Sequence, residues 1–126
     1  MPGTRKDEAP IAVDIPEMEG RYVELGGYTV GYETFKVDMD PAPFFRGLLD
    51  DRCQSPHWGV VVKGRLTFRY ADREETFASG DAYYAPAGHT PLMAADTEVI
   101  EFSPSDALQA TMSVVEANLA AAASSA

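Results

Sequence analysis

The sequence predicts an all-β domain that ends in one helix, and three observations support this fold class. Short segments rich in β-branched and aromatic residues follow one another between residues 21 and 102. Glycine or polar turns separate these segments every ~8–12 residues, a spacing typical of a β-sandwich or β-barrel. Apolar residues return at helical spacing only in the last part of the chain. We therefore expect a small barrel or jelly roll with a C-terminal α-helix.

Each expected strand is bounded by a turn signal. Residues 65–70 alternate most clearly, with Leu66, Phe68 and Tyr70 on one face. Lys63-Gly64 is the tight turn that precedes this strand, and the polar run 71–74 follows it as a hairpin loop. The full set of predicted strands is 28–37, 58–62, 65–70, 75–78, 81–85 and 97–102.

The remaining segments divide the chain into three parts. Residues 1–20 are charged and proline-containing, so we interpret them as a loose arm, part of which can pair as a strand. Residues 21–104 form the barrel, and a connection over 38–51 holds one helical turn around 44–49. Residues 105–126 form the helix, with Ser105 as the N-cap and fraying from residue 120. Its apolar stripe is Leu108, Met112, Val115 and Leu119.

Composition excludes several classes of partner. The 126 residues carry 20 Asp and Glu against 10 Lys and Arg, a formal net charge of −10. That sign disfavours nucleic acid and anionic membrane surfaces, since both need clustered positive charge. No apolar run spans a membrane, and residues 1–19 lack the apolar core of a signal peptide. One cysteine forms no internal disulfide, which fits a cytoplasmic protein. These bounds indicate a small, acidic domain of the cytoplasm.

The two histidines and the cysteine carry the strongest chemical signal. Cys53 and His57 are four residues apart, and His89 follows the turn 86–88. In a regular strand Asp51, Cys53 and His57 share one face, and in a barrel that face can be the interior. Thiolate and imidazole ligands suit Zn²⁺, Fe²⁺ or copper and leave positions for water or substrate. The alternatives are a core histidine, an inert buried thiol and a surface turn histidine. A nucleophile–base pair of Cys53 and His57 ranks below metal binding.

The segment 80–88 resembles the second motif of the cupin superfamily, G-x5-P-x-G, through Gly80, Pro86 and Gly88. The resemblance covers about residues 28–102 and implies the cupin β-barrel. When Gly64 is aligned with the last glycine of the first cupin motif, His57 falls at the family's glutamate. Cys53 and Asp51 then fall at its two histidines.

Two positions depart from the cupin pattern. The metal ligand of the second motif falls at Pro91, while this chain has His89 two residues earlier. The asparagine that usually ends the motif is Ala95 here. The resemblance thus implies a divalent transition metal, Zn²⁺ before Fe²⁺, Cu or Ni²⁺, held by Cys53, His57 and His89. The third ligand position is open between His89 and Asp51.

Three further positions are candidates near such a site. Glu101 interrupts the apolar strand 99–102, and a carboxylate that points into a barrel has a raised pKa and can act as a general base. The alternative is that Glu101 faces solvent. Tyr83 and Tyr84 lie on opposite faces, so one of them lines the interior; we take Tyr84 as the catalytic candidate. Trp58 faces away from His57 and is expected in sheet packing or a dimer contact.

The sequence therefore favours a metal-dependent small-molecule enzyme of cupin type, with oxygenase, isomerase and lyase reactions all open. The alternative is a non-catalytic domain that binds or senses a small molecule or a metal. The resemblance also implies a homodimer, for which we expect the N-terminal segment and the aromatic outer sheet to form the contact.

Overall fold

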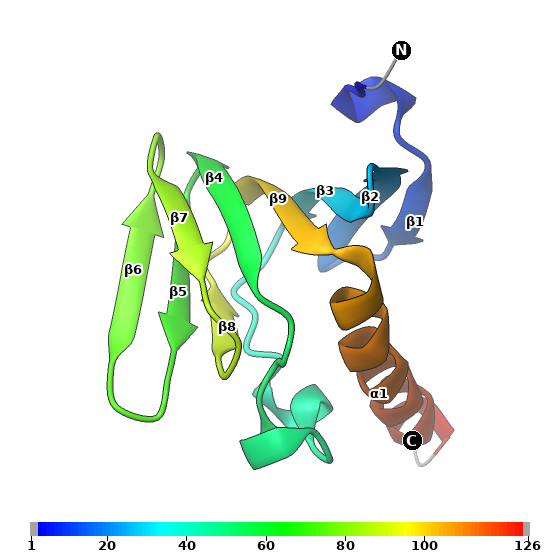
Figure 1. The fold of residues 1–126 in the computed structure, drawn as a ribbon, viewed down its shortest axis with the longest axis vertical. Helices are drawn as coiled ribbons and strands as arrows, with labels where there is room; N and C mark the ends of the chain where they lie inside the picture. Colours follow the sequence, from blue (N-terminus) through cyan, green and yellow to red (C-terminus); the bar gives the residue numbers. More distant parts are fainter. Residues whose placement is uncertain (1–2, 125–126) are drawn as a thin grey trace.

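A computed structural model describes residues 3–124, and Figure 1 shows their arrangement. The described chain forms nine strands, three short 3₁₀ turns and one α-helix. The strands are β1 Ile11–Asp14, β2 Met18–Leu25, β3 Tyr28–Phe35, β4 His57–Lys63, β5 Arg65–Arg69, β6 Glu74–Ala78, β7 Ala82–Ala85, β8 Thr90–Met93 and β9 Thr97–Pro104. The helix α1 is Ser105–Ser124, and the 3₁₀ turns are η1 Lys6–Glu8, η2 Ala42–Phe45 and η3 Leu49–Asp51.

The strands form two antiparallel sheets. The larger has the order β1-β2-β3-β9-β4-β7, and the smaller has the order β6-β5-β8. In Figure 1 the small sheet lies at the left, β1–β3 lie at the right, and β4 and β9 run between them. β9 therefore lies between β3 of the N-terminal hairpin and β4 from the middle of the chain.

One apolar core lies between the two sheets. Alternate residues of β4 and β5 point into it, and Val61, Leu66 and Phe68 are all at most 3% exposed. The whole cluster is Phe35, Val61, Leu66, Phe68, Tyr83, Ala85, Met93 and Val99. Its residues come from both sheets, so sheet-on-sheet packing holds the barrel together.

A close backbone approach fixes the turn between β4 and β5. Gly64 has φ +85°, and a Cβ there would collide with the Thr97 side chain and backbone. The hydroxyl of Thr97 accepts from the Arg65 amide and donates to the Arg65 carbonyl, both at 3.0 Å. Glycine is needed here for both its conformation and its lack of a side chain.

The all-β prediction with a C-terminal helix is confirmed, and its details change in four places. Residues 11–14 and 18–25 pair with the larger sheet, so the predicted arm 1–20 supplies a strand and the start of another. The strand 90–93 is absent from the predicted set. It contains Pro91, which is tolerated there because β8 is an edge strand. The connection 38–51 holds two 3₁₀ turns in place of one helical turn.

The fourth difference concerns the helix. The helix already begins at Ser105, one residue before an N-cap at this position would allow, and the Ser105 hydroxyl lies 2.9 Å from the Thr29 hydroxyl on a neighbouring strand. The helix continues to Ser124, beyond the start of the fraying predicted from residue 120; residues 125 and 126 lie outside the described part. Val115 packs on η2, where Asn118 donates to two backbone carbonyls. No helix among residues 3–124 is long and apolar enough to cross a bilayer.

Candidate metal centre and adjoining cavity

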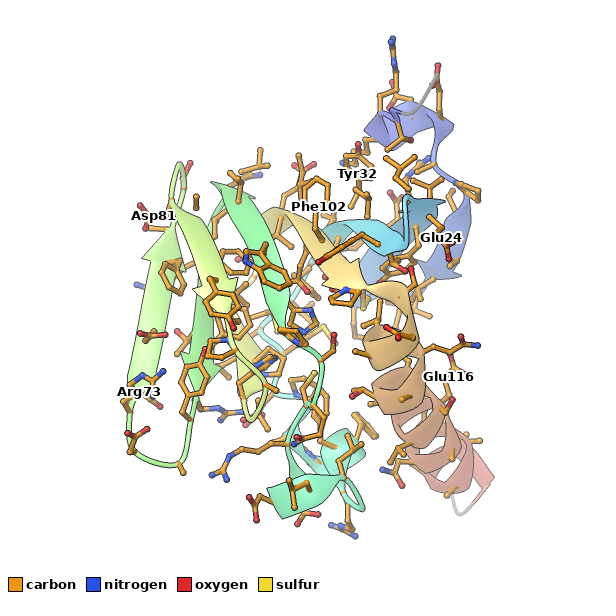
Figure 2. All side chains as sticks on the ribbon, viewed as in Figure 1. Glu24, Tyr32, Arg73, Asp81, Phe102 and Glu116 are labelled. Carbon is orange, nitrogen blue, oxygen red and sulfur yellow. The ribbon has the colours of Figure 1, made fainter. Side chains whose placement is uncertain are left out.

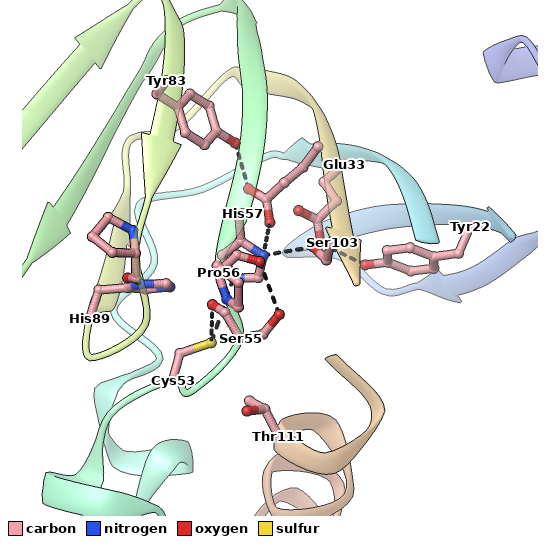
Figure 3. Close-up of polar contacts among 12 residues, drawn as sticks. Tyr22, Glu33, Cys53, Ser55, Pro56, His57, Tyr83, His89, Ser103 and Thr111 are labelled. Carbon is pink, nitrogen blue, oxygen red and sulfur yellow. Dashed lines mark hydrogen bonds and ion pairs between the residues drawn. The ribbon is translucent and has the colours of Figure 1, made fainter. Parts of the chain in front are cut away.

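Cys53, His57 and His89 come together at one end of the barrel interior (Figure 3). All three are buried, and their candidate ligand atoms lie within 4.8 Å of one another. Backbone pairing holds two of them in place. The Cys53 amide donates to the His89 carbonyl at 2.7 Å, and the Gly88 amide donates to the Cys53 carbonyl at 2.8 Å. The two loops that carry the cupin-like motifs are thereby joined directly.

His57 begins β4 and is oriented by two partners on β9. Its Nδ1 lies 2.7 Å from the Ser103 hydroxyl and 3.1 Å from Oε1 of Glu101. When Glu101 is ionised it only accepts, so Nδ1 then carries the proton and Nε2 keeps its lone pair. That Nε2 lies 3.5 Å from the Cys53 sulfur. His57 thus presents a free nitrogen to the cluster, in the orientation that a carboxylate partner gives to metal-binding histidines.

His89 is oriented by its own turn. Its Nδ1 lies 2.8 Å from the Pro86 carbonyl, which can only accept, so Nδ1 is the protonated nitrogen. The ring packs edge-on against Phe68 and Tyr70 and lies 5.0 Å, centroid to centroid, from the ring of His57. Nε2 is therefore the nitrogen that remains available as a ligand.

Burial keeps the three donors uncharged in the absence of a metal. It lowers the pKa of His57 and that of His89 to about 4, so both rings are neutral at pH 7. Burial raises the pKa of the Cys53 thiol to about 11, with a smaller opposing effect of a hydrogen bond with the Ser55 backbone. Neutral imidazoles are ready to bind a metal, whereas the thiol must first lose its proton to it.

The donor set fits a transition metal. Two ligands of one tetrahedral ion lie about 3.3–3.8 Å apart when the bonds are ~2.1 Å to nitrogen and ~2.3 Å to sulfur. The 3.5 Å contact between Cys53 and His57 has that spacing already. Two imidazole nitrogens and one sulfur are borderline to soft donors, which suit Zn²⁺, Fe²⁺ and copper better than Ca²⁺ or Mg²⁺.

Glu101 faces the barrel interior, beside the cluster. Its carboxylate accepts from the Tyr83 hydroxyl and from His57, and its side chain is 15% exposed. Burial raises the pKa of Glu101 to about 7, against a lowering by the Tyr83 hydrogen bond. Tyr83 reaches this position because Gly59 faces it across the strand pair; a Cβ at Gly59 would collide with the tyrosine ring.

The structure corrects the prediction for Tyr84. This residue is 52% exposed on the outer face of β7, where its ring stacks on Trp58 at 5.0 Å. Strand alternation sends the preceding residue, Tyr83, inward. Tyr83 therefore takes the interior position predicted for Tyr84, while Trp58 faces outward as predicted.

Asp51 does not join the cluster. It lies in η3 with φ +55°, and its carboxylate accepts from the Gly47 amide at 3.0 Å. The premise that Asp51 and Cys53 share one regular strand is wrong, because Asp51 is the last residue of the 3₁₀ turn η3. Pro91, at the cupin ligand position, offers no ligand atom, and His89 stands in the cluster instead.

Sequence reasoning missed a second carboxylate in the interior, Glu33 on β3. The Tyr22 hydroxyl donates to Oε2 of Glu33 at 2.6 Å (Figure 3). The Tyr22 ring has room because Gly20 and Gly31 flank it; a Cβ at either would approach the ring within 3.0 Å. Alternation backwards from buried Phe35 was the available signal, since it turns residues 31 and 33 inward.

A cavity of about 250 Å³ adjoins the cluster between α1 and strands β1, β2, β3 and β9. Glu33, Glu101 and Ser103 form part of its wall, and Leu108 and Met112 of α1 face them. The partners of His57 thus belong also to the cavity. A molecule held there would contact Glu101 and Ser103, the two partners of His57.

Comparison with known proteins supports the fold through structure alone. No protein-family model matches the sequence, and no curated protein is detectably similar to it. An RmlC-like cupin from Shewanella frigidimarina superposes with a TM-score of 0.56 at 13% identity, covering 80% of this chain and 88% of that one. KdgF from Halomonas sp. gives 0.52 at 15% identity, covering 79% and 92%. FeII HppE gives 0.55 at 13% identity, covering 79% of this chain and 58% of that one.

These neighbours and the motif 80–88 define the class: the chain has the fold of the cupin superfamily. Within that class it is a small domain whose cluster of donors is Cys53, His57 and His89. The resemblance stated from Gly80, Pro86 and Gly88 is confirmed at the level of the fold.

Proposed function

We propose that this protein is a metal-dependent enzyme that acts on a small molecule inside the barrel. The observation that carries the proposal is the convergence of Cys53, His57 and His89 within 4.8 Å, next to a cavity. When bound, a divalent transition metal supplies Lewis acidity, and iron or copper supplies redox chemistry as well.

The chain's own residues would hold the ligands and handle protons. Glu101 and Ser103 keep the Nδ1 proton of His57 in place, so that Nε2 stays aimed at the cluster. Glu101, with a pKa of about 7, can take up or release a proton near neutrality. Tyr83 orients that carboxylate through its hydroxyl. The apolar core behind His89 and Phe68 excludes water from this side.

Metal content tests the ligand set. We expect about one first-row transition metal per chain in the purified or reconstituted protein, and its loss in His89→Ala. Asp51→Asn is the matched control, because Asp51 aligns with a cupin ligand but lies outside the cluster, and its metal content should equal that of the wild type. Absence of metal after reconstitution with Zn²⁺, Fe²⁺ and Ni²⁺ would overturn the proposal.

The reactivity of Cys53 tests its part separately. A metal-bound thiolate resists iodoacetamide and becomes more reactive once a chelator removes the metal. Equal alkylation rates with and without metal would remove Cys53 from the ligand set. In Cys53→His we expect metal binding to persist, with relative affinity shifted from Zn²⁺ toward Fe²⁺ or Mn²⁺, since imidazole is a harder ligand than thiolate.

A binding or sensing domain without turnover is the second candidate function. The observation that favours it is that both oxygens of Glu101 already have partners, Tyr83 and His57. A base that reacts with substrate must release one of them. A turnover screen of the metal-loaded protein separates the two candidates.

A further inference from the structure

We propose that the cavity beneath α1 binds a small organic cation, an alkylammonium ion, with Glu33 as its charge partner. The inference goes beyond the proposed function, because it needs only the cavity and Glu33 and stands whether or not the cluster holds a metal.

The charge of the cavity wall points to a cation. Glu33, Glu101 and Glu116 line it, and no Lys, Arg or His is among its lining residues. Two partly buried acidic groups elsewhere show the usual alternative, a basic partner: Arg21 pairs with Glu19 at 2.8 Å, and Lys6 pairs with Glu98 at 2.8 Å. Among the described residues Glu33 has no basic partner of this kind, so a positively charged ligand would supply the missing charge.

Glu33 has one carboxylate oxygen that can accept a further hydrogen bond. Its Oε2 accepts from Tyr22, while its Oε1 has no hydrogen bond to any residue in the range 3–124. Glu101 differs, because its two oxygens are taken by Tyr83 and His57. Burial and the nearby Glu101 raise the pKa of Glu33 to about 7, which shows that its negative charge is poorly compensated. An ammonium group donates up to three hydrogen bonds, and Glu33 Oε1 can accept one of them.

The rest of the cavity sets the size and polarity of the ligand. A volume of about 250 Å³ holds roughly eight non-hydrogen atoms at ~30 Å³ each, the share of one water in the liquid. Leu108 and Met112 on α1, with Ala12 and Val13 on β1, form an apolar wall that suits alkyl carbons. An ammonium head at Glu33 with a chain of four to six carbons along α1 meets both requirements. An anionic ligand would instead face three carboxylates.

The test uses metal-free full-length protein carrying ¹³C-methyl methionine, titrated with n-butylammonium, n-pentanol and pentanoate. We expect n-butylammonium to bind saturably and to shift the methyl signal of Met112, which lines the cavity, but not that of Met93, which lies in the core. Glu33→Gln should weaken binding at least tenfold. Glu74→Gln, on exposed β6 of the other sheet, should leave it unchanged.

A second variant keeps the carboxylate and removes the space. Leu108→Trp fills the cavity from α1, and we expect it to abolish binding while Glu33 is intact. The inference is overturned if pentanol or pentanoate binds as tightly as n-butylammonium, if Met112 does not respond, or if Leu108→Trp binds normally. Because the titration is done without metal, its failure leaves the proposed metal site untouched. Loss of metal in His89→Ala likewise leaves the cation site standing.

Discussion

On the large sheet, three pairs of consecutive residues place one side chain on the inner face and one on the outer face. In each pair the first residue points into the barrel and is polar, and the second points outward and is a large aromatic. The pairs are His57–Trp58 on β4, Tyr83–Tyr84 on β7 and Glu101–Phe102 on β9. These strands are adjacent, so each set of three forms a continuous group.

The inner and outer groups are held together differently. Inside, Glu101 links His57 to Tyr83 through hydrogen bonds. Outside, Trp58 stacks on Tyr84 and meets Tyr28 edge-on at 6.1 Å. The outer rings of Trp58, Tyr84 and Phe102 are 40–52% exposed; Figure 2 labels Phe102 on β9.

This is the reverse of an ordinary half-buried sheet, which places apolar residues inside and polar residues outside. A buried hydrogen-bonded network that includes a carboxyl adds little to stability over an apolar core and is destabilising when incomplete. The inner group is therefore consistent with the proposed role of the cluster in metal binding. The outer group has the composition of a surface that another protein covers.

The largest expected effect concerns the outer face. We expect a homodimer in which the exposed aromatic group packs against a second copy, together with the N-terminal segment. Each copy carries a net charge of −10, and the aromatic rings offer an uncharged area where two such chains can meet. Trp58→Ser should weaken the dimer by about 30-fold or more, the effect of losing a central aromatic contact of ~2 kcal/mol.

Analytical ultracentrifugation at micromolar concentration measures this effect. Leu92→Ser is the control, since Leu92 is exposed to a similar degree but lies on β8 of the other sheet. A monomer mass for the wild type would rule the dimer out.

The same alternation explains how much of the site was predictable. The period of two residues placed His57 and Trp58 on opposite faces correctly, and turn signals identified most strands. The chemistry of Cys53, His57 and His89 could be recognised because they are the protein's single cysteine and two histidines.

What could not be predicted depends on contacts distant in sequence. The choice between Tyr83 and Tyr84 depends on the register of β7 against β4, which puts Tyr83 opposite Gly59. The approach of His89 to Cys53 depends on a backbone bridge between two loops 36 residues apart. Asp51 does not lie on the predicted face because it belongs to the 3₁₀ turn η3. Glu33 belongs to β3, a strand on which the sequence shows no recognisable motif.

The second prediction concerns the inner face and the pH. In the metal-free protein the lowered pKa values of His57 and His89 reduce stability as pH falls from 7 to 5, because the unfolded chain then binds protons that the folded chain does not. The raised pKa values of Glu33 and Glu101 act oppositely, since the folded chain binds protons first. We therefore expect a nearly flat free energy of unfolding over this range.

Glu33→Gln removes one of the opposing contributions. Its free energy of unfolding should fall by about 2 kcal/mol relative to wild type between pH 7 and pH 5, given 1.36 kcal/mol per pKa unit. Urea unfolding of both proteins in the presence of a chelator measures the difference, and Glu74→Gln should follow the wild type. Parallel curves for Glu33→Gln and wild type would contradict the electrostatic account of the inner face.

The smallest effect comes from the two adjacent tyrosines. Tyr83→Phe removes the hydroxyl that donates to Glu101, so it should cost about 1 kcal/mol of stability and raise the pKa of Glu101 further, because the hydrogen bond holds that pKa down. Tyr84→Phe keeps the ring that stacks on Trp58 and should change stability by less than about 0.5 kcal/mol. Unfolding in urea gives the two stabilities, and the carboxyl ¹³C shift of Glu101 followed against pH gives its pKa. The two substitutions remove the same atom from neighbouring positions, so only the face of the sheet distinguishes them. Equal losses, or a Glu101 pKa that moves in Tyr84→Phe and not in Tyr83→Phe, would show that the hydroxyl of Tyr83 does not orient the carboxylate beside His57.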